Sequence, residues 1–259
     1  MKNKINIHIV EFEDKDSWIK GSKEFPQLFK EAYSWMEEIE AGFENEFSEF
    51  IETEFIHYHP KDEKEMINNI KAKEGLNIYV CGSHFVSYAS IKKLSEEGIL
   101  KKEKTEFLQF DFHPDLRDVY EGRKLSHATM TKRIAELGLN ITQIGIGEQS
   151  IEDLYNAKKH RIKQFYELPE YKEIRGVLSK DVYLSLDADA FTFFSNVSTP
   201  SLSKIDESVF KFLKNLSQDK RMVGIDIVEI IDSKTDSMKA AQLIRKILFY
   251  IFKGKDKES

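Results

Sequence analysis

Hydrophobic residues follow two alternating patterns along the chain. Short apolar runs of strand length alternate with longer segments in which apolar residues recur at the helical period of about 3.6 residues. The short runs predict strands at residues 5–10, 76–82, 106–113, 141–147, 181–187 and 222–230. The periodic segments predict helices at residues 62–73, 84–97, 127–138, 150–160, 206–217 and 237–253. This alternation is typical of a mostly parallel sheet that is covered by helices on both faces.

Two segments lie outside this pattern. Residues 26–55 are acidic and rich in aromatic side chains, and we expect them to be helical. The last six residues, 254–259, are polar and predict a frayed tail. Because no repeat and no low-complexity linker interrupts the chain, we expect residues 1–259 to form a single three-layer α/β domain.

Acidic and histidine residues gather where the predicted strands end. Four strand ends carry them, in the segments "CGSH", "DFHPD", "SLDADA" and "DIVE". Ligands of open α/β sheets bind outside the carboxyl ends of the strands, so these residues are expected to form a site. Aspartate is depleted in strands and is rarely buried unless it is paired or coordinated. The pattern therefore predicts that a cation is held at this end of the sheet.

The segment after the predicted strand 106–113 places Asp111, His113 and Asp115 at alternate positions. Side chains two apart on a strand point to the same side, so the three are expected to share one face. In a straight strand, Asp111 and Asp115 would stand about 13 Å apart, too far to meet at one ion. Either the chain curls at Pro114, or the site holds more than one metal ion.

Three further residues complete a candidate ligand set: His84, Asp187 and Asp189. The full set contains two histidines, four aspartates and no thiolate, which suits manganese or a similar divalent ion better than a structural zinc. Four carboxylates carry the charge that two divalent ions neutralise. Two such ions would lower the pKa of a shared water and provide a nucleophile near neutral pH. The set therefore predicts a hydrolase.

Composition narrows the classes of partner. The chain has 45 acidic and 39 basic residues and a net charge of −6, and its basic residues are dispersed. No electrostatic footprint for nucleic acid appears, so we expect a small-molecule substrate. The single cysteine, Cys81, excludes an intramolecular disulfide and favours a reducing compartment. The charged N-terminus is unlike a signal peptide and no apolar run approaches about 20 residues, so we expect a cytoplasmic protein without a membrane span.

The motifs "GSH", "DFHPDLRD", "SLDADAF" and "GIDIVE" stand in an order and spacing that resembles the ureohydrolase family of arginases, agmatinases and formiminoglutamases. The segment "DLRDVYEGRKLSHATMTKRI" looks most like archaeal-type agmatinases. The similarity covers about residues 75 to 252, and residues 1–75 diverge. The resemblance implies a manganese-dependent hydrolase that converts a guanidino compound, with agmatine as the leading candidate, to urea and an amine. It also implies a homo-oligomer, a trimer or a hexamer.

The resemblance further implies a role for each matching residue, with two manganese ions per chain. His84 and Asp115 would bind one ion, and His113 and Asp189 would bind the other. Asp111 and Asp187 would bridge both ions. Asp115 would also orient the nucleophile. Glu229 would face the guanidinium group, and His127 would relay a proton toward the leaving amine. These three are the expected catalytic residues.

Some positions depart from the family pattern. Ser83 stands where an acidic residue is usual, Glu148 where an arginine is expected, and Thr192 and Phe193 replace an Asp-Pro pair. The N-terminal motif rich in glycine and proline is missing. These departures leave open an arginase, a guanidinobutyrase, a formiminoglutamase or a catalytically silent relative that serves as a subunit or binding protein.

One rival enzyme class also fits part of the sequence. "LSLDADAF" resembles the strand end of phosphatases that use an aspartate nucleophile. Those enzymes place threonine or valine where this chain has Phe191, and the phosphatase interpretation leaves the other three motifs unused. The ureohydrolase interpretation uses all four.

Overall fold

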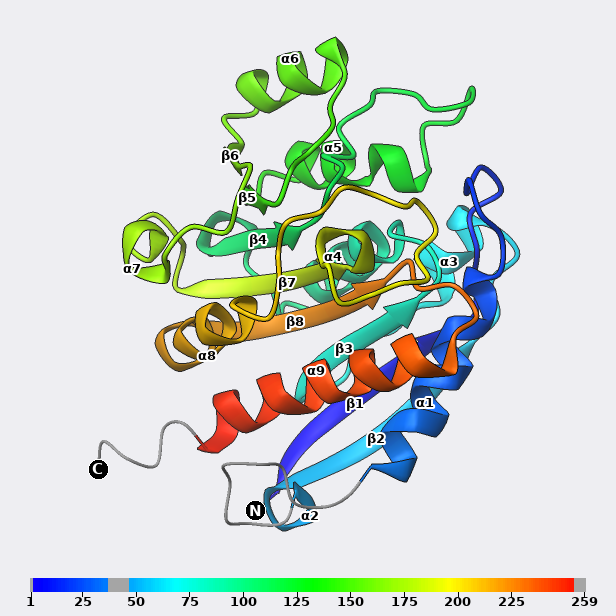
Figure 1. The fold of residues 1–259 in the computed structure, drawn as a ribbon, viewed down its shortest axis with the longest axis vertical. Helices are drawn as coiled ribbons and strands as arrows, with labels where there is room; N and C mark the ends of the chain where they lie inside the picture. Colours follow the sequence, from blue (N-terminus) through cyan, green and yellow to red (C-terminus); the bar gives the residue numbers. More distant parts are fainter. Residues whose placement is uncertain (1, 37–46, 254–259) are drawn as a thin grey trace.

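The computed structural model describes residues 2–36 and 47–253, in which eight parallel strands form one sheet. The order across the sheet is β2-β1-β3-β8-β7-β4-β5-β6 (Figure 1). The strands are β1 (Asn3–Val10), β2 (Ile51–Tyr58), β3 (Leu76–Cys81), β4 (Thr105–Phe110), β5 (Asn140–Ile144), β6 (Lys163–Phe165), β7 (Asp181–Asp187) and β8 (Arg221–Val228).

Helices cover both faces of this sheet. One face carries α1 (Phe25–Trp35), α8 (Val209–Asp219) and α9 (Lys234–Lys253), and the other carries α3 (Glu63–Asn69), α4 (Val86–Glu96) and α5 (Met130–Glu136) (Figure 1). The remaining helices are α2 (Phe47–Phe50), α6 (Ile151–Lys159) and α7 (Tyr171–Ile174). Short 3-10 turns are η1 (Ser22–Glu24), η2 (Lys102–Lys104), η3 (His127–Thr129) and η4 (Ala188–Ala190).

The central strands are buried on both sides. In β3, Ile78 and Val80 belong to the core on one face of the sheet, whereas Tyr79 and Cys81 belong to the core on the other. This alternation follows from the two-residue period of a strand, and it explains why the strands read as nearly continuous apolar runs. Each fully buried isoleucine contributes about 1.5–3 kcal/mol of burial free energy relative to an exposed one.

The predicted fold class is confirmed. Each strand and helix that the apolar pattern predicted is present, with bounds that differ by at most four residues. Within residues 2–36 and 47–253, none of the helices combines the length and the apolar character that crossing a bilayer requires.

The prediction for residues 26–55 was wrong in part. The segment begins with α1 and includes α2, but from Ile51 onward it forms the strand β2, while residues 37–46 lie outside the described residues. As an edge strand, β2 pairs with β1 alone and is only partly buried. The alternation of Ile51, Thr53 and Phe55 with the exposed Glu52 and Glu54 is typical of a strand, and the helical prediction overlooked it. The predicted polar tail at 254–259 also lies outside the described residues.

The topology brings the four motif-bearing strands together. β3, β8, β7 and β4 are consecutive neighbours in the middle of the sheet. Their register places Cys81 and Asp187 beside Val228, and Phe110 beside Leu186. The carboxyl ends of these strands therefore lie at one level, and the residues that follow them meet above the centre of the sheet (Figure 1).

Candidate metal centre

The chain curls directly after β4, so the predicted shared strand face for Asp111, His113 and Asp115 was wrong. The strand ends at Phe110, and the backbone N–H of Phe112 then donates to Asp189 Oδ1 at 3.0 Å. The N–H of His113 donates to Asp111 Oδ1 at 2.6 Å, and Asp115 adopts a left-handed φ of 52°. The curl therefore brings together carboxylates that a straight strand would hold far apart.

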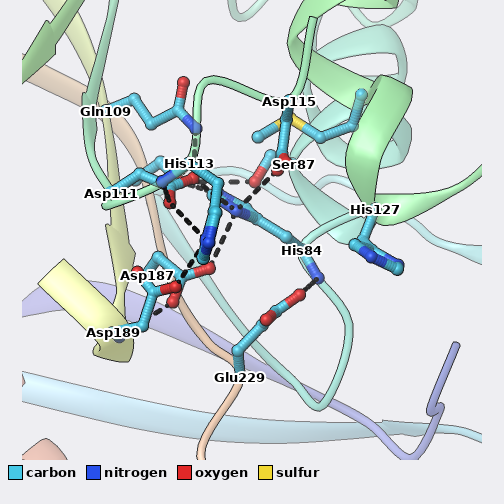
Figure 2. Close-up of polar contacts among 12 residues, drawn as sticks. His84, Ser87, Gln109, Asp111, His113, Asp115, His127, Asp187, Asp189 and Glu229 are labelled. Atoms are coloured by element: carbon cyan, nitrogen blue, oxygen red, sulfur yellow. Dashed lines mark hydrogen bonds and ion pairs between the residues drawn. The ribbon is translucent and has the colours of Figure 1, made fainter. Parts of the chain in front are cut away.

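His84 lies at the centre of one group of ligand atoms (Figure 2). Its Nδ1 lies 3.1 Å from Asp111 Oδ2, 3.3 Å from Asp115 Oδ2 and 3.0 Å from Asp187 Oδ2. The ring is fully buried, and Nδ1 has no hydrogen-bond partner among the described residues. A buried nitrogen that faces three carboxylates in this way could serve as a ligand atom for a metal ion.

A second group of ligand atoms lies beside the first. His113 Nδ1 is 2.8 Å from Asp189 Oδ2 and 3.9 Å from Asp111 Oδ1. Asp189 Oδ2 is also buried without a hydrogen-bond partner among the described residues. Asp111 belongs to both groups, and the ligand atoms of each group lie within 4.8 Å of one another. Two neighbouring cation positions that share one carboxylate fit this arrangement.

Further residues hold the two groups in place. Ser185 Oγ lies 2.9 Å from His84 Nε2 and donates to Asp226 Oδ1 at 2.7 Å, which leaves Nδ1 of His84 for the carboxylates. Gln109 Nε2 donates to Asp111 Oδ2 at 2.5 Å. Such partners fix the orientation of ligands and tune the affinity for metal. Sequence reasoning missed Ser185 and Gln109, although each stands two residues before an aspartate of the site.

The electrostatics of the cluster favour a cation. Burial, with a further effect from Asp115 and Asp189, raises the pKa of Asp111 to about 7. Burial and the nearby carboxylates also hold the pKa of Asp187 well above its usual range. Burial alone would lower the pKa of His84, but the carboxylates that face its ring hold it well above the usual value. The cluster retains protons that a divalent cation would displace, so its donors fit a metal ion.

A cavity of about 660 Å³ opens over the cluster. Asp111, His113, Asp115 and Asp187 line its floor, and further lining residues are Glu229, His127, Asp16, Trp18, Arg117, Tyr120, Glu148 and Asp153. His84 and Asp189 complete the floor through their contacts with these aspartates. The structure thus brings all eight residues that the sequence singled out to one place.

Glu229 follows β8 and is buried at the cavity wall. Ser198 Oγ donates to its Oε2 at 2.9 Å, and the backbone N–H of His84 donates to its Oε1 at 3.4 Å. Burial raises the pKa of Glu229. Glu229 also has a left-handed φ of 65°, and Asp115 shares this conformation, which is costly for residues other than glycine. Backbone strain of this kind concentrates at functional sites.

His127 opens the turn η3 and lies beside the cluster (Figure 2). Its Nδ1 lies 3.2 Å from Oδ2 of the buried Asp14, and its ring meets Tyr120 edge to face at 5.4 Å between centroids. Burial would lower the pKa of His127, but Asp14 and Glu229 raise it to about 9. His127 therefore carries a proton at neutral pH and can act as an acid.

The positions that depart from the family pattern differ in their surroundings. Phe193 stacks on Phe191 and Phe210, so it is part of the aromatic core. Ser83 is fully buried, and neither Ser83 nor Thr192 lines the cavity. Glu148 does line it. Of these positions, Glu148 is the one placed to contact a substrate directly.

Comparison with known proteins agrees with this geometry. A model of the arginase family matches residues 3–252, and so includes the N-terminal segment in which the motifs showed no similarity. The chain is 27% identical to an agmatinase of Pyrococcus horikoshii over 73% of this chain and 68% of that protein. It is 31% identical to a mitochondrial arginase of Arabidopsis thaliana over 66% of this chain, but only 54% of that protein. The structure of an agmatine ureohydrolase of Thermoplasma volcanium superposes with a TM-score of 0.83, at 21% identity, and covers 100% of this chain and 92% of that one.

Proposed function

The chain belongs to the arginase family, and on that premise we propose that it hydrolyses agmatine to putrescine and urea with two manganese ions. One observation carries this proposal. Two groups of histidine and aspartate ligands lie side by side and share Asp111, which is the arrangement that a pair of bridged divalent ions requires. A single structural ion would need only one of the two groups.

The family resemblance assigns the ligands, and the distances are compatible with it. His84 and Asp115 would hold one ion, His113 and Asp189 would hold the other, and Asp111 belongs to both groups. The resemblance gives Asp187 the same shared role, and its Oδ2 lies 3.0 Å from His84 Nδ1. When bound, the two ions supply the Lewis acidity that lowers the pKa of a water and provides a nucleophile at neutral pH. Asp115 would accept a hydrogen bond from such a water and orient it toward the guanidinium carbon. The strained backbone of Asp115 is compatible with such a positioning task.

Guanidinium is a weak electrophile because its positive charge is delocalised. Glu229 pairs with that charge, since its carboxylate lines the cavity and is oriented by Ser198. His127 provides the proton that the departing nitrogen needs. Addition of water to the guanidinium carbon and cleavage of the bond from that carbon to the alkylated nitrogen would give urea and an alkylammonium ion. The two protons that the departing nitrogen gains would come from the water, one of them through His127, which is thereby restored. No covalent intermediate with the protein forms, and both products are released from the cavity.

The charged residues that line the cavity beside the candidate ligands support a substrate with a cationic tail. They include the carboxylates of Asp16, Glu148 and Asp153 and the guanidinium of Arg117. Asp16 pairs with Arg123, and Asp153 receives hydrogen bonds from Ser150. No described ion pair involves Glu148, so its carboxylate is available to a substrate. The free amine of agmatine would meet this carboxylate, whereas the α-carboxylate of arginine would be repelled by it.

A panel of substrates tests the proposal. Manganese-loaded protein would be incubated with agmatine, arginine, guanidinobutyrate and formiminoglutamate, and both the urea and the released amine or glutamate measured. We expect agmatine to give the highest kcat/KM, and His113→Ala to abolish the reaction. A preference for another compound would replace the proposed substrate. If the protein binds metal but yields no product from any of them, the catalytically silent alternative holds.

A further inference from the structure

One buried carboxylate of the N-terminal loop approaches the site from outside the metal cluster. Asp14 follows β1 and is 0% exposed. Its Oδ2 accepts a hydrogen bond from the backbone N–H of His127 at 3.0 Å and lies 3.2 Å from Nδ1 of the same residue. One oxygen thus accepts a hydrogen bond from the backbone of a residue that lies 113 positions later in the chain and stands at ion-pair distance from its ring nitrogen, to which the described residues give no hydrogen bond.

The loop that carries Asp14 is held firmly in place. Arg123 donates to Asp14, Asp16 and Glu63, so one guanidinium ties the loop to α3 and to the segment that leads into η3. On its other side, the loop packs on Gly82, just after β3. A Cβ atom at Gly82 would lie only 2.3 Å from the carbonyl oxygen of Ser22, so no larger residue fits there. The same Cβ atom would lie 2.7 Å from the carbonyl oxygen of Phe12, so the chain on both sides of Asp14 packs against the end of β3.

We propose that Asp14 is a positioning residue, which binds the Nδ1 edge of His127 so that the opposite nitrogen, Nε2, serves the reaction in the cavity. This inference rests on the proposed function only in the identity of the reaction. In an imidazole ring, a group that holds one nitrogen fixes the orientation and the proton of the other. The groups that face His127 are Asp14 from the loop, Glu229 after β8, Asp115 after β4 and the ring of Tyr120.

The contacts of Asp14 with His127 and with Arg123 allow two roles to be distinguished, positioning of the His127 ring and stabilisation of the fold. Asp14 could stabilise the fold through Arg123 alone, and then its effect on catalysis would not depend on His127. If Asp14 acts through His127, removing either residue removes the same contribution to catalysis. The two alternatives therefore predict different results for a double-mutant cycle.

The test compares the Asp14→Asn, His127→Ala and double variants by the kcat and KM of urea release. Removal of a group that orients a catalytic residue typically costs about 10- to 100-fold in activity. We expect Asp14→Asn to lower kcat by about that factor, with KM changed less than about threefold and manganese content unaltered. In the His127→Ala background, Asp14→Asn should cause no further loss. Losses that multiply, or an unchanged kcat for Asp14→Asn, would overturn the proposal.

Asp181→Asn is the matched control. Asp181 also pairs with an arginine, Arg221, but it stands at the start of β7, away from the cavity lining. We expect its loss to leave kcat unchanged. A similar fall in kcat for both variants would show that Asp14 acts only through general stability.

A second measurement does not depend on activity. The ring ¹⁵N shifts of His127 would be recorded for the full-length protein and for Asp14→Asn, both free of paramagnetic metal. We expect the Asp14→Asn substitution to change the protonation or tautomer of the ring; unchanged shifts would overturn the proposal. If the unaltered protein releases no product from any substrate while its shifts respond to Asp14→Asn, the proposed function fails and the positioning contact stands.

Discussion

The two ends of the same parallel sheet differ in how their buried carboxylates are neutralised. At the start of β7, Asp181 receives two hydrogen bonds from the guanidinium of Arg221, which holds the pKa of Asp181 below its usual range. At the carboxyl end of the central strands, burial raises the pKa of Asp111 and Asp187. The described residues provide no Lys or Arg ion pair to these two carboxylates. At the start of β7, an arginine of the chain neutralises the carboxylate charge. At the carboxyl end of the central strands, the carboxylates need a cation that the chain does not supply.

A histidine elsewhere in the sheet sharpens the contrast. His8 in β1 is fully buried like His84, but its Nε2 faces Asn77 Oδ1 at 2.9 Å and its Nδ1 faces the hydroxyl of Tyr58 at 3.1 Å. Burial lowers the pKa of His8 to about 4 despite the hydrogen bond to Asn77. Burial thus keeps His8 uncharged because its hydrogen-bond partners are neutral and do not offset the effect of burial on its pKa, whereas carboxylates surround His84. Burial alone does not mark a functional histidine; its partners do.

The largest expected effect comes from Asp187→Asn, which removes one carboxylate from the cluster at the carboxyl end of the central strands. We expect urea release to fall by more than the roughly 100-fold that is the upper limit usual for outer partners of a metal site. The same substitution should raise the melting temperature of the metal-free protein, because it replaces a carboxyl group whose ionisation is opposed by burial first and then by Asp189, Glu229 and Asp111. Each kcal/mol of relief corresponds to about 2–4 °C in a chain of this size. Calorimetry that showed a lower melting temperature would contradict the account of the cluster.

The next effect concerns pH and stability at His8. Its folded pKa, about 4, lies below the ordinary value of 6.5, so the unfolded chain takes up the proton first as the pH falls. Stability is retained above pH 6.5 and decreases between pH 6.5 and 4, by up to about 3 kcal/mol from this residue. Urea denaturation of the unaltered chain and of His8→Gln over this range measures the difference. Parallel pH curves for the two proteins would show that His8 has no such role.

A smaller effect is expected at Glu148, whose exposed carboxylate lines the cavity and is proposed to bind the amine of the substrate. A charged hydrogen bond to the amine of agmatine contributes about 1.5 kcal/mol, or roughly tenfold in binding. Glu148→Gln should therefore raise KM for agmatine about tenfold, with little change in kcat or in bound manganese. Glu167→Gln, a change of an exposed glutamate paired with Lys204, is the control. Equal KM values for both variants would remove Glu148 from substrate recognition.

The smallest effect is expected at the start of β7, where Asp181 pairs with Arg221. Arg221 is 58% exposed, so the pair that it forms with Asp181 is partly screened by water. We expect Asp181→Asn to lower the free energy of unfolding by about 1 kcal/mol or less and to leave urea release unchanged. Denaturant titration beside the substrate assay checks both statements. A loss of activity would show that general stability, even far from the cavity, limits urea release.

The sequence predicted the strands, and it predicted which residues gather at their ends, better than it predicted the geometry between them. β7 has its predicted bounds, since residues 181–187 form a continuous buried run that ends at a turn. The end of β4 was misplaced because the alternation of Phe110 and Phe112 continues past the strand. The curl depends on a hydrogen bond from Phe112 to Asp189, 77 positions away, which no local pattern reports.

The order of strands is a second property that the linear pattern does not contain. The motifs after β3, β4, β7 and β8 could be seen to follow strands, but only the topology shows these strands to be neighbours. Asp14 was not singled out for the same reason: it lies in a loop, and its contact with His127 exists only in the folded chain. Local chemistry is thus readable from sequence, while contacts between distant segments require the structure.

The central claim is that the carboxylates above β4 and β7 are completed by a pair of divalent cations. The most direct test is the metal content of manganese-loaded, dialysed protein by mass spectrometry, with and without His113→Ala. We predict about two ions per chain for the unaltered protein and a lower content for the variant. Protein that retains no manganese, or a content that His113→Ala leaves unchanged, would contradict the claim.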